Sequence, residues 1–243
     1  MNRVVVITGA SSGLGLSLAE KFLRAGDQVY GISKTRRNWK TAKAKLAGAK
    51  NFHLDQGDVS LEANVKAFLL KVYKQAGRID ILINNAGYAH RLARIEEETL
   101  SEFKKHLSAN LISVFLVCKH SLPIFQKQNH GWILNIASMA GVRAVPRLGA
   151  YSAGKFGVLA LTQSIAKENK EARFSCVTVC PGGINTQMRE KLFGKEDANR
   201  QQSAEFVADK ILEIVEGKIP MHSGSSIVIR HGQIDAIHFL PEA

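Results

Sequence analysis

A chain of 243 residues can bury a sizeable core, and α/β folds of about this length commonly form one domain. Apolar residues make up 45% and charged residues 22%, which excludes a disordered or fibrous protein. The net charge of +12 would suit nucleic acid, a membrane surface or an acidic partner, but the cations are scattered outside Arg36-Arg37 and Lys104-Lys105. We therefore expect a basic, solvated surface and no specific nucleic-acid site.

Neither export nor membrane insertion is expected. The apolar run at 4–7 is too short for the core of a signal peptide, and the longest apolar stretch, 111–118, is far below the roughly 20 residues that span a bilayer. Cys176 and Cys180 lie four residues apart in an expected strand, or about 13 Å, whereas a disulfide needs Cα atoms within about 7 Å. We expect buried free thiols and a cytoplasmic location.

Short apolar or β-branched runs alternate with helical patterns along the chain. Strands are expected at 4–7, 28–32, 81–83, 132–137, 176–180 and 226–229, and helices at about 14–25, 61–76, 100–126, 150–169 and 204–216. This alternation predicts one α/β domain over 1–243, with a doubly wound parallel sheet and helices on both faces. The end, 222–243, predicts an edge strand and an apolar tail (234–240) that packs on its own chain or on another subunit.

A glycine-rich motif, Thr8-Gly9-Ala10-Ser11-Ser12-Gly13-Leu14-Gly15, follows the first strand and opens the first helix. Glycines there permit a tight turn and let a pyrophosphate approach backbone N–H groups at a helix N-terminus. A glycine turn also serves plain strand-to-helix packing, but strand, glycines and helix in this order predict a nucleotide site.

The spacing Thr-Gly-x3-Gly-x-Gly, together with Asn84-Asn85-Ala86-Gly87, resembles the short-chain dehydrogenase/reductase family over nearly the whole chain. The resemblance implies a Rossmann fold that binds a nicotinamide dinucleotide. It implies that Gly9, Ser11, Ser12, Leu14 and Gly15 line the phosphates, that Asp58 and Val59 meet the adenine, that Asn85, Ala86 and Gly87 meet the adenosine ribose, and that Ile184 and Thr186 face the nicotinamide carboxamide.

The end of the second strand bears on the choice between NAD and NADP. A carboxylate there would bind the ribose 2′-hydroxyl of NAD, whereas this chain has Ser33-Lys34-Thr35-Arg36-Arg37. A hydroxyl and several cations favour a phosphate through charge-assisted hydrogen bonds, so we expect NADP(H), with Ser33 and Lys34 among its contacts. NAD(H) remains the alternative, because the arginines could simply decorate a loop and Ser12 stands where many NADP-using relatives have a basic residue.

Tyr151 and Lys155 share one face of an expected helix, because they lie four residues apart. A free tyrosine has a pKa near 10, so acid–base chemistry at neutral pH needs nearby positive charge, which Lys155 and an oxidised nicotinamide supply. Such pairs are common on exposed helices, so the context decides. Ser138 closes the preceding strand at the carboxyl edge of the sheet, where folds of this kind bind ligands.

Asn110, Ser138, Tyr151 and Lys155 together resemble the complete catalytic set of the family. The resemblance implies that Tyr151 gives its proton to a carbonyl oxygen in reduction and that Ser138 hydrogen-bonds the same oxygen. Lys155 would lower the pKa of the tyrosine and bind the nicotinamide ribose, while Asn110 would position a water that links Lys155 to solvent. The alternatives are a polar residue in a bent helix for Asn110 and a strand-end cap for Ser138. No metal site is expected, because no histidine cluster has metal-binding spacing.

Two segments, about 139–150 and 187–202, would form the substrate walls by the same resemblance. Arg143 and Arg147 bracket the approach to Tyr151 and would favour an anionic substrate or carrier unless they belong to the surface. The short second segment predicts an open cleft. The pattern is closest to 3-oxoacyl-[acyl-carrier-protein] reductases, which implies an acyl-thioester substrate, although general ketone and aldehyde reductases share nearly all of it.

Small residues on the helix from Ala150, namely Ala153, Gly154, Gly157 and Ala160, allow a close neighbour. The resemblance implies a homodimer or homotetramer through this helix, but the same face could pack only on the sheet. We expect an NADP(H)-dependent oxidoreductase that moves a hydride between nicotinamide and a carbonyl or alcohol. The alternative is a non-catalytic dinucleotide sensor, because a fold alone does not determine function.

Overall fold

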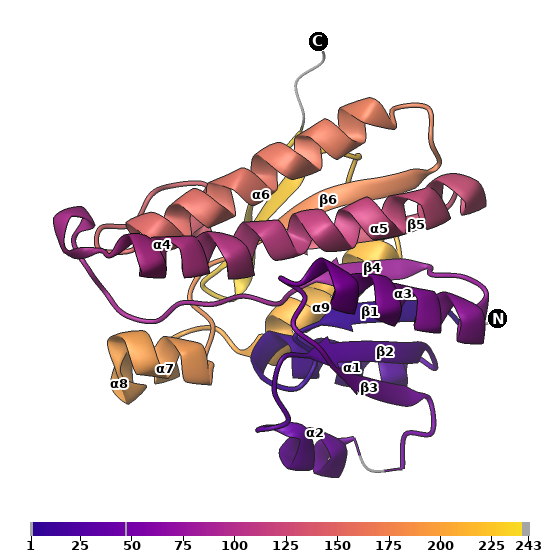
Figure 1. Cartoon of the computed structure of the whole chain (residues 1–243), viewed down its shortest axis with the longest axis horizontal. Helices are drawn as coiled ribbons and strands as arrows, with labels where there is room; N and C mark the ends of the chain where they lie inside the picture. Colours follow the sequence, from indigo (N-terminus) through magenta and orange to yellow (C-terminus); the bar gives the residue numbers. More distant parts are fainter. Residues whose placement is uncertain (1, 47, 240–243) are drawn as a thin grey trace.

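A single twisted sheet forms the centre of the molecule, which the computed structural model describes over residues 2–46 and 48–239 (Figure 1). Within these ranges the strand order is β3-β2-β1-β4-β5-β6-β7-β8, parallel except for the antiparallel pair β7 and β8. The strands are β1 (Val4–Thr8), β2 (Gln28–Ser33), β3 (Phe52–Gln56), β4 (Ile81–Asn84), β5 (Gly131–Ile136), β6 (Phe174–Pro181), β7 (Ser226–Arg230) and β8 (Gln233–His238).

Helices cover both faces of the sheet (Figure 1). They are α1 (Gly13–Arg24), α2 (Trp39–Lys45), α3 (Glu62–Ala76), α4 (Leu100–Leu107), α5 (Ser113–Gln128), α6 (Gly149–Glu168), α7 (Gln187–Phe193), α8 (Lys195–Asn199) and α9 (Ala204–Val215). Successive residues of β1 enter opposite cores: Val5 packs with α1 and α9, whereas Val6 packs with α3, α5 and α6. Because side chains alternate across a strand, a strand buried on both faces is apolar throughout. The doubly wound α/β fold predicted from the sequence is confirmed.

Two strands differ from the sequence prediction. The edge strand β3 was not predicted, because its sequence, Phe-His-Leu-Asp-Gln, is half polar and only partly buried. The expected apolar tail at 234–240 is largely the strand β8, which pairs with β7 and so packs on its own chain. Residue 240 lies outside the described residues.

The single helix expected over 100–126 is also incorrect, because the structure divides it into α4, a π-helical turn (Ser108–Ile112) and α5. In this turn the N–H of Ser113 bonds the carbonyl of Ser108, five residues back. The side chain of Asn110 donates from Nδ2 to the carbonyl of His106 at 3.0 Å, which satisfies an acceptor inside the widened turn.

The joined stretch Leu100–Gln128 is long and apolar enough to cross a membrane by length and composition alone. A core helix of a globular domain passes the same test. Here α5 packs Val114, Val117 and Phe125 into the core on the sheet, which accounts for its apolar character.

A buried amide connects the elements that surround the cleft. Asn135 in β5 is fully buried, accepts a hydrogen bond from Asn84 Nδ2 in β4 at 2.8 Å, and donates from Nδ2 to Thr162 Oγ1 in α6 at 2.9 Å. A buried polar group of this kind is stable only when it is paired, so it specifies how the strands and α6 meet.

Candidate active site

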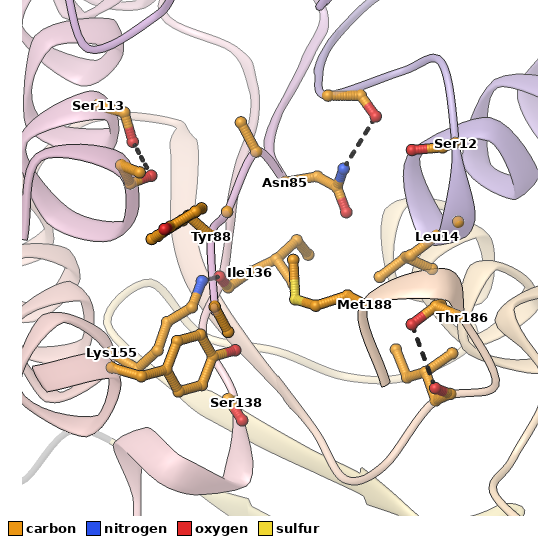
Figure 2. A pocket seen from close by; sticks show the side chains of 18 of the residues that line it. Ser12, Leu14, Asn85, Tyr88, Ser113, Ile136, Ser138, Lys155, Thr186 and Met188 are labelled. Carbon is orange, nitrogen blue, oxygen red and sulfur yellow. Dashed lines mark hydrogen bonds between the residues drawn. The ribbon is translucent and has the colours of Figure 1, made fainter. Parts of the chain in front are cut away.

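The main cavity lies at the carboxyl ends of the parallel strands, where the chain order reverses beside β1. Crevices at such switch points are the usual ligand sites of doubly wound sheets. The cavity has a volume of about 700 Å³. It extends from the glycine-rich loop to Lys155 and Ser138, with Met188 between the two ends (Figure 2).

The glycine-rich loop forms one end of this cavity. Gly9 has a φ of +71°, a left-handed conformation that favours glycine, and its N–H donates to the Ile32 carbonyl at 2.7 Å. Gly9, Ser11, Ser12 and Leu14 line the cavity, but Gly15 does not, and their contact with cofactor phosphates stays a prediction. A Cβ at Gly15 would lie 2.2 Å from the Gly9 carbonyl oxygen, so this glycine lets α1 pack closely against the loop.

The segment after β4 is anchored to β1. Thr8 Oγ1 accepts hydrogen bonds from the N–H groups of Asn85 and Ala86 at 3.0 and 2.9 Å, and Asn85 Nδ2 donates to the Thr8 carbonyl at 2.9 Å. Gly87 lies beside the expected catalytic residues, because a Cβ there would be 3.1 Å from Asn110 Oδ1 and 3.7 Å from Lys155 Nζ. The motif residues Asn85, Ala86 and Gly87 all line the cavity.

At the end of β2, Ser33 and Lys34 line the cavity together with Asp58 and Val59. Ser33 Oγ accepts from the Ser11 N–H at 3.2 Å, and Lys34 Nζ lies 2.7 Å from Asp58 Oδ2. Burial works to raise the pKa of Asp58, but hydrogen bonds from Lys34 and Ser60 outweigh it and hold this pKa below its usual range.

Arg36 turns away from the cavity. Its Nε donates to Gln56 Oε1 at 2.9 Å and its guanidinium lies 5.1 Å from the ring centre of Trp39. Neither Arg36 nor Arg37 is among the described residues that line the cavity, so Lys34 is the cation of this run that faces it.

Ser138, Tyr151 and Lys155 come together at the other end. Lys155 is 3% exposed, and its Nζ donates to the Ile136 carbonyl at 2.8 Å and lies 5.7 Å from the Tyr151 ring centre. Burial lowers the pKa of Lys155 to about 8. Burial raises the pKa of Tyr151, and a hydrogen bond with Ser138 opposes this rise in part. The protein alone therefore does not lower the tyrosine pKa, and the expected lowering requires a further positive charge.

Asn110 lies behind this group rather than on the cavity wall. It is fully buried, and its carboxamide is occupied by the backbone of Tyr88: Oδ1 accepts from the Tyr88 N–H at 3.0 Å and Nδ2 donates to the Tyr88 carbonyl at 2.7 Å. The side chain thus joins the segment after β4 to the π-helical turn. This geometry matches the alternative of a polar residue in a bent helix, and the water-binding role stays a prediction.

The remaining wall comes from the segment after β6 and from the two expected substrate segments, 139–150 and 187–202. Ile184 and Thr186 line the cavity, and Thr186 Oγ1 caps α7 by accepting from the Arg189 N–H at 3.3 Å. The second segment, 187–202, contains the short helices α7 and α8, which the sequence analysis did not predict.

Several residues that line the cavity belong to no motif and were not predicted. Tyr88 directly follows the Asn-Asn-Ala-Gly motif, and this position in the sequence is the one feature that could have predicted its place in the cavity. Examples that gave no signal and meet only through the fold are Asn38, Ser60, Lys105 and Ser113. Across the described ranges, no group of three or more His, Cys, Asp or Glu side chains could hold a metal ion.

Fold and site together define a Rossmann-type α/β protein with a serine, a tyrosine and a lysine at the carboxyl edge of its sheet. The chain belongs to the short-chain dehydrogenase/reductase family of oxidoreductases: residues 3–197 match the family model described as short chain dehydrogenase. It is 30% identical to the 2-(R)-hydroxypropyl-CoM dehydrogenase of Xanthobacter autotrophicus, over 94% of this chain and 97% of that protein.

Two similar solved structures contain a cofactor. ElxO with NADP bound matches with a TM-score of 0.85 and 26% identity, over 94% of this chain and 96% of ElxO. The 3-ketoacyl-(acyl-carrier-protein) reductase from Brucella melitensis, complexed with NADH, matches with a TM-score of 0.86 and 26% identity, over 95% and 97% of the two chains.

The lowered pKa of Lys155 predicts that this residue destabilises the folded protein. Between about pH 8 and the usual lysine pKa of 10.5, the unfolded chain holds a proton that the folded protein has lost, so the free energy of unfolding should rise with pH across this window. Lys155→Met should remove that rise and stabilise the protein at pH 7 by about 1 to 3 kcal/mol, because no ammonium is then desolvated.

Urea unfolding at pH 7 and at several values up to pH 10 measures both effects. Lys167→Met, on the exposed end of α6, is the matched control and should show neither. A Lys155→Met protein that is less stable at pH 7 and keeps the wild-type pH slope would contradict this account.

Proposed function

We propose that the protein is an NADP(H)-dependent carbonyl reductase or alcohol dehydrogenase, in which Tyr151 exchanges the proton. The observation that carries this proposal is the shared cavity: Ser138, Tyr151 and Lys155 line one end, and the glycine-rich loop with Lys34 lines the other. An extended dinucleotide fits such a cavity with its phosphates at the start of α1 and its nicotinamide near Tyr151. When bound, the nicotinamide supplies or accepts the hydride at the carbonyl carbon.

The residues that would hold the cofactor fit this placement. Four residues of the glycine-rich loop that the resemblance singles out, Gly9, Ser11, Ser12 and Leu14, line the cavity, and Gly87 leaves room beside Lys155 where a side chain would intrude. Ile184 and Thr186 also line the cavity, Thr186 beside Gly13 of the glycine-rich loop, and they are the residues that we propose face the nicotinamide carboxamide. Similar structures that bind NADP or NADH support a nicotinamide dinucleotide.

Hydrogen bonds within the site indicate what each group can still do. Ser138 Oγ accepts from the Ala140 N–H at 3.1 Å and also hydrogen-bonds Tyr151, so a substrate oxygen would take the place of Tyr151 as the acceptor of the Ser138 proton. Lys155 Nζ gives one of its three protons to the Ile136 carbonyl, which leaves two for ribose hydroxyls or water. In reduction, Tyr151 Oη gives its proton to the carbonyl oxygen while the hydride forms the new C–H bond. In oxidation the proton and the hydride each move in the opposite direction.

Removing the phenol proton tests this mechanism. Tyr151→Phe should lower kcat by about a thousandfold or more, because the developing alkoxide then lacks its proton donor, while the Kd for NADPH changes by less than about threefold. NADPH consumption with a short 3-oxoacyl thioester and with simple ketones measures this loss.

The substrate panel also separates the narrower candidates. Turnover selective for the thioester favours a 3-oxoacyl-[acyl-carrier-protein] reductase, and turnover of the ketones alone favours a general ketone or aldehyde reductase. NADPH binding without turnover of any carbonyl favours the non-catalytic sensor. Retained activity in Tyr151→Phe would overturn the mechanism.

Lys34 is the residue that we propose selects NADP(H) over NAD(H). We expect kcat/KM to favour NADPH over NADH by about tenfold or more. Lys34→Ala should lower the value for NADPH by about 10- to 100-fold and that for NADH by less than about threefold, because a charge-assisted hydrogen bond to the 2′-phosphate is lost. Arg36→Gln is the control and should change neither, since Arg36 turns toward Gln56 and Trp39. An equal loss with both cofactors would contradict the assignment.

A second copy of the chain is the partner that we propose for the outer face of α5 and α6. Phe115 on α5 and Phe156 on α6 are 45% and 42% exposed, and Ile112 adds a third exposed apolar side chain at 44%. Gly154 and Gly157 face inward, because a Cβ at either would meet Asn110 or Leu111 within 3.1 Å, while Ala153 and Ala160 are exposed. Exposed apolar area of this kind marks an interaction surface, and two such faces would form a homodimer or one interface of a homotetramer.

Phe156→Glu should split this assembly, because it places a charge in the centre of the proposed interface. Sedimentation velocity should then show a smaller species than the wild type. Leu70→Glu, at a residue that is 55% exposed on α3, is the matched control and should leave the assembly intact. A wild-type protein that sediments as a monomer, or a Phe156→Glu protein that keeps the assembly, would overturn the proposal.

A cytoplasmic location is proposed on the three free cysteines, all of them buried, which suit a reducing compartment. We propose neither nucleic-acid nor membrane partners.

A further inference from the structure

The substrate end of the cavity has apolar walls on two sides. One wall comes from the segment after β5 and the other from one face of α7, whose Met188 points toward the space beside Ile136 in Figure 2. The side chains that form these walls are Met139, Val145 and Leu148 on one side and Met188, Leu192 and Phe193 on the other. This part of the cavity therefore offers dispersion and hydrophobic contact to a substrate.

Apart from Lys155, whose remaining protons we assign to the nicotinamide ribose, the cations near this end are already engaged. Lys105 forms an ion pair with Glu102. Arg189 lines the cavity, but its guanidinium binds Asp197 through two hydrogen bonds, Nε to Oδ1 at 2.5 Å and Nη2 to Oδ2 at 3.0 Å. The same guanidinium lies 3.8 Å from the ring centre of Phe193. An anionic substrate would have to displace both contacts to use this charge.

The arginines that the sequence placed near Tyr151 also point elsewhere. Arg143 and Arg147 are exposed and do not line the cavity, whereas Val145 and Leu148 from the same segment do. The segment is held in this orientation by pairing between Ala93 and Leu148, with the Ala93 N–H donating to the Arg147 carbonyl at 3.0 Å. The expectation that these arginines favour an anionic substrate is therefore not supported by their positions.

We propose that the cleft takes carbonyl compounds whose substituents next to the carbonyl are uncharged and largely apolar, and that Asp197 sets this preference by keeping the Arg189 guanidinium paired. The proposal rests on the function proposed above, which supplies the reaction. A carboxylate beside the carbonyl would lose its hydration against Met188 and Leu192 without gaining a free cation, which is unfavourable. Asp197 is a specificity-determining residue here, because it acts through Arg189 and touches no reacting atom.

Matched substrate pairs that differ in charge test this inference. The ketones 4-oxopentanoate and 3-oxobutanoate are each compared with their methyl esters, with NADPH as reductant. For the wild type, kcat/KM should favour the esters by about a hundredfold, because the acids bring an unpaired charge into the apolar end.

Asp197→Asn removes the charge that binds Arg189 while keeping the size of the side chain. The ester-to-acid ratio should fall by about tenfold, because the released guanidinium can pair with the carboxylate. Combining it with Arg189→Gln should restore the wild-type ratio. Glu196→Gln is the matched control: it removes the neighbouring carboxylate, which pairs with Arg200 instead, and should leave the ratio unchanged. A ratio measured on one preparation does not depend on the fraction of folded protein.

The possible outcomes separate the inference from the proposed function. Turnover that prefers the acids, or a ratio that Asp197→Asn does not change, overturns the inference and leaves the function standing. If none of these ketones is reduced, the rise in Tm of the NADP-bound protein with each ester and acid decides the inference by binding alone, and the proposed function fails only if the 3-oxoacyl thioester is not reduced either. A larger rise with the esters supports it, and a larger rise with the acids overturns it.

Discussion

The buried amide of Asn135 is the interaction on which the candidate active site depends. It bonds Asn84 in β4 and Thr162 in α6, and it lies in β5, one residue before the carbonyl that accepts from Lys155. Strand β4 leads into the Asn85–Gly87 segment and β5 leads to Ser138, while α6 carries Tyr151 and Lys155. Because a buried amide loses free energy unless it is paired, one relative arrangement of strands and helix is favoured over nearby alternatives. The positions of the reacting groups follow from that arrangement.

The buried charge of Lys155 lowers the free energy of unfolding, whereas two other cations at the site are paired. Lys155 is buried beside an uncharged phenol, and its lowered pKa reflects the free energy needed to remove an ammonium from water. Lys34 and Arg189 instead lie against carboxylates, Asp58 and Asp197, so their charges are already compensated. The two ends of the cavity therefore differ: Lys34 remains 72% exposed and able to meet a phosphate, whereas Arg189 is 25% exposed and held against Phe193.

Much of the site could be predicted, because its motifs are local. The segment Asn85 to Gly87, the residues Ser138, Tyr151 and Lys155, and the glycine-rich loop apart from Gly15 line one cavity, while their contacts with cofactor and substrate stay predictions. Gly15 and Asn110 do not line the cavity. Gly15 allows α1 to pack closely against the loop, and Asn110 is buried with its amide bonded to the backbone of Tyr88. The edge strand β3 was missed because a half-buried, half-polar strand has little periodic signal.

The sequence by itself determined the family, the doubly wound α/β fold and the identity of the groups that meet at the carboxyl edge of the sheet, because apolar periodicity and short motifs are written in neighbouring residues. Only the tertiary structure decided which polar side chains are free. Arg36 bonds Gln56 from another strand, Asn110 bonds Tyr88 from another segment, and Arg189 bonds Asp197 across the turn between α7 and α8. Such pairings depend on distances of a few ångströms between residues apart in the chain, and residue spacing does not contain them.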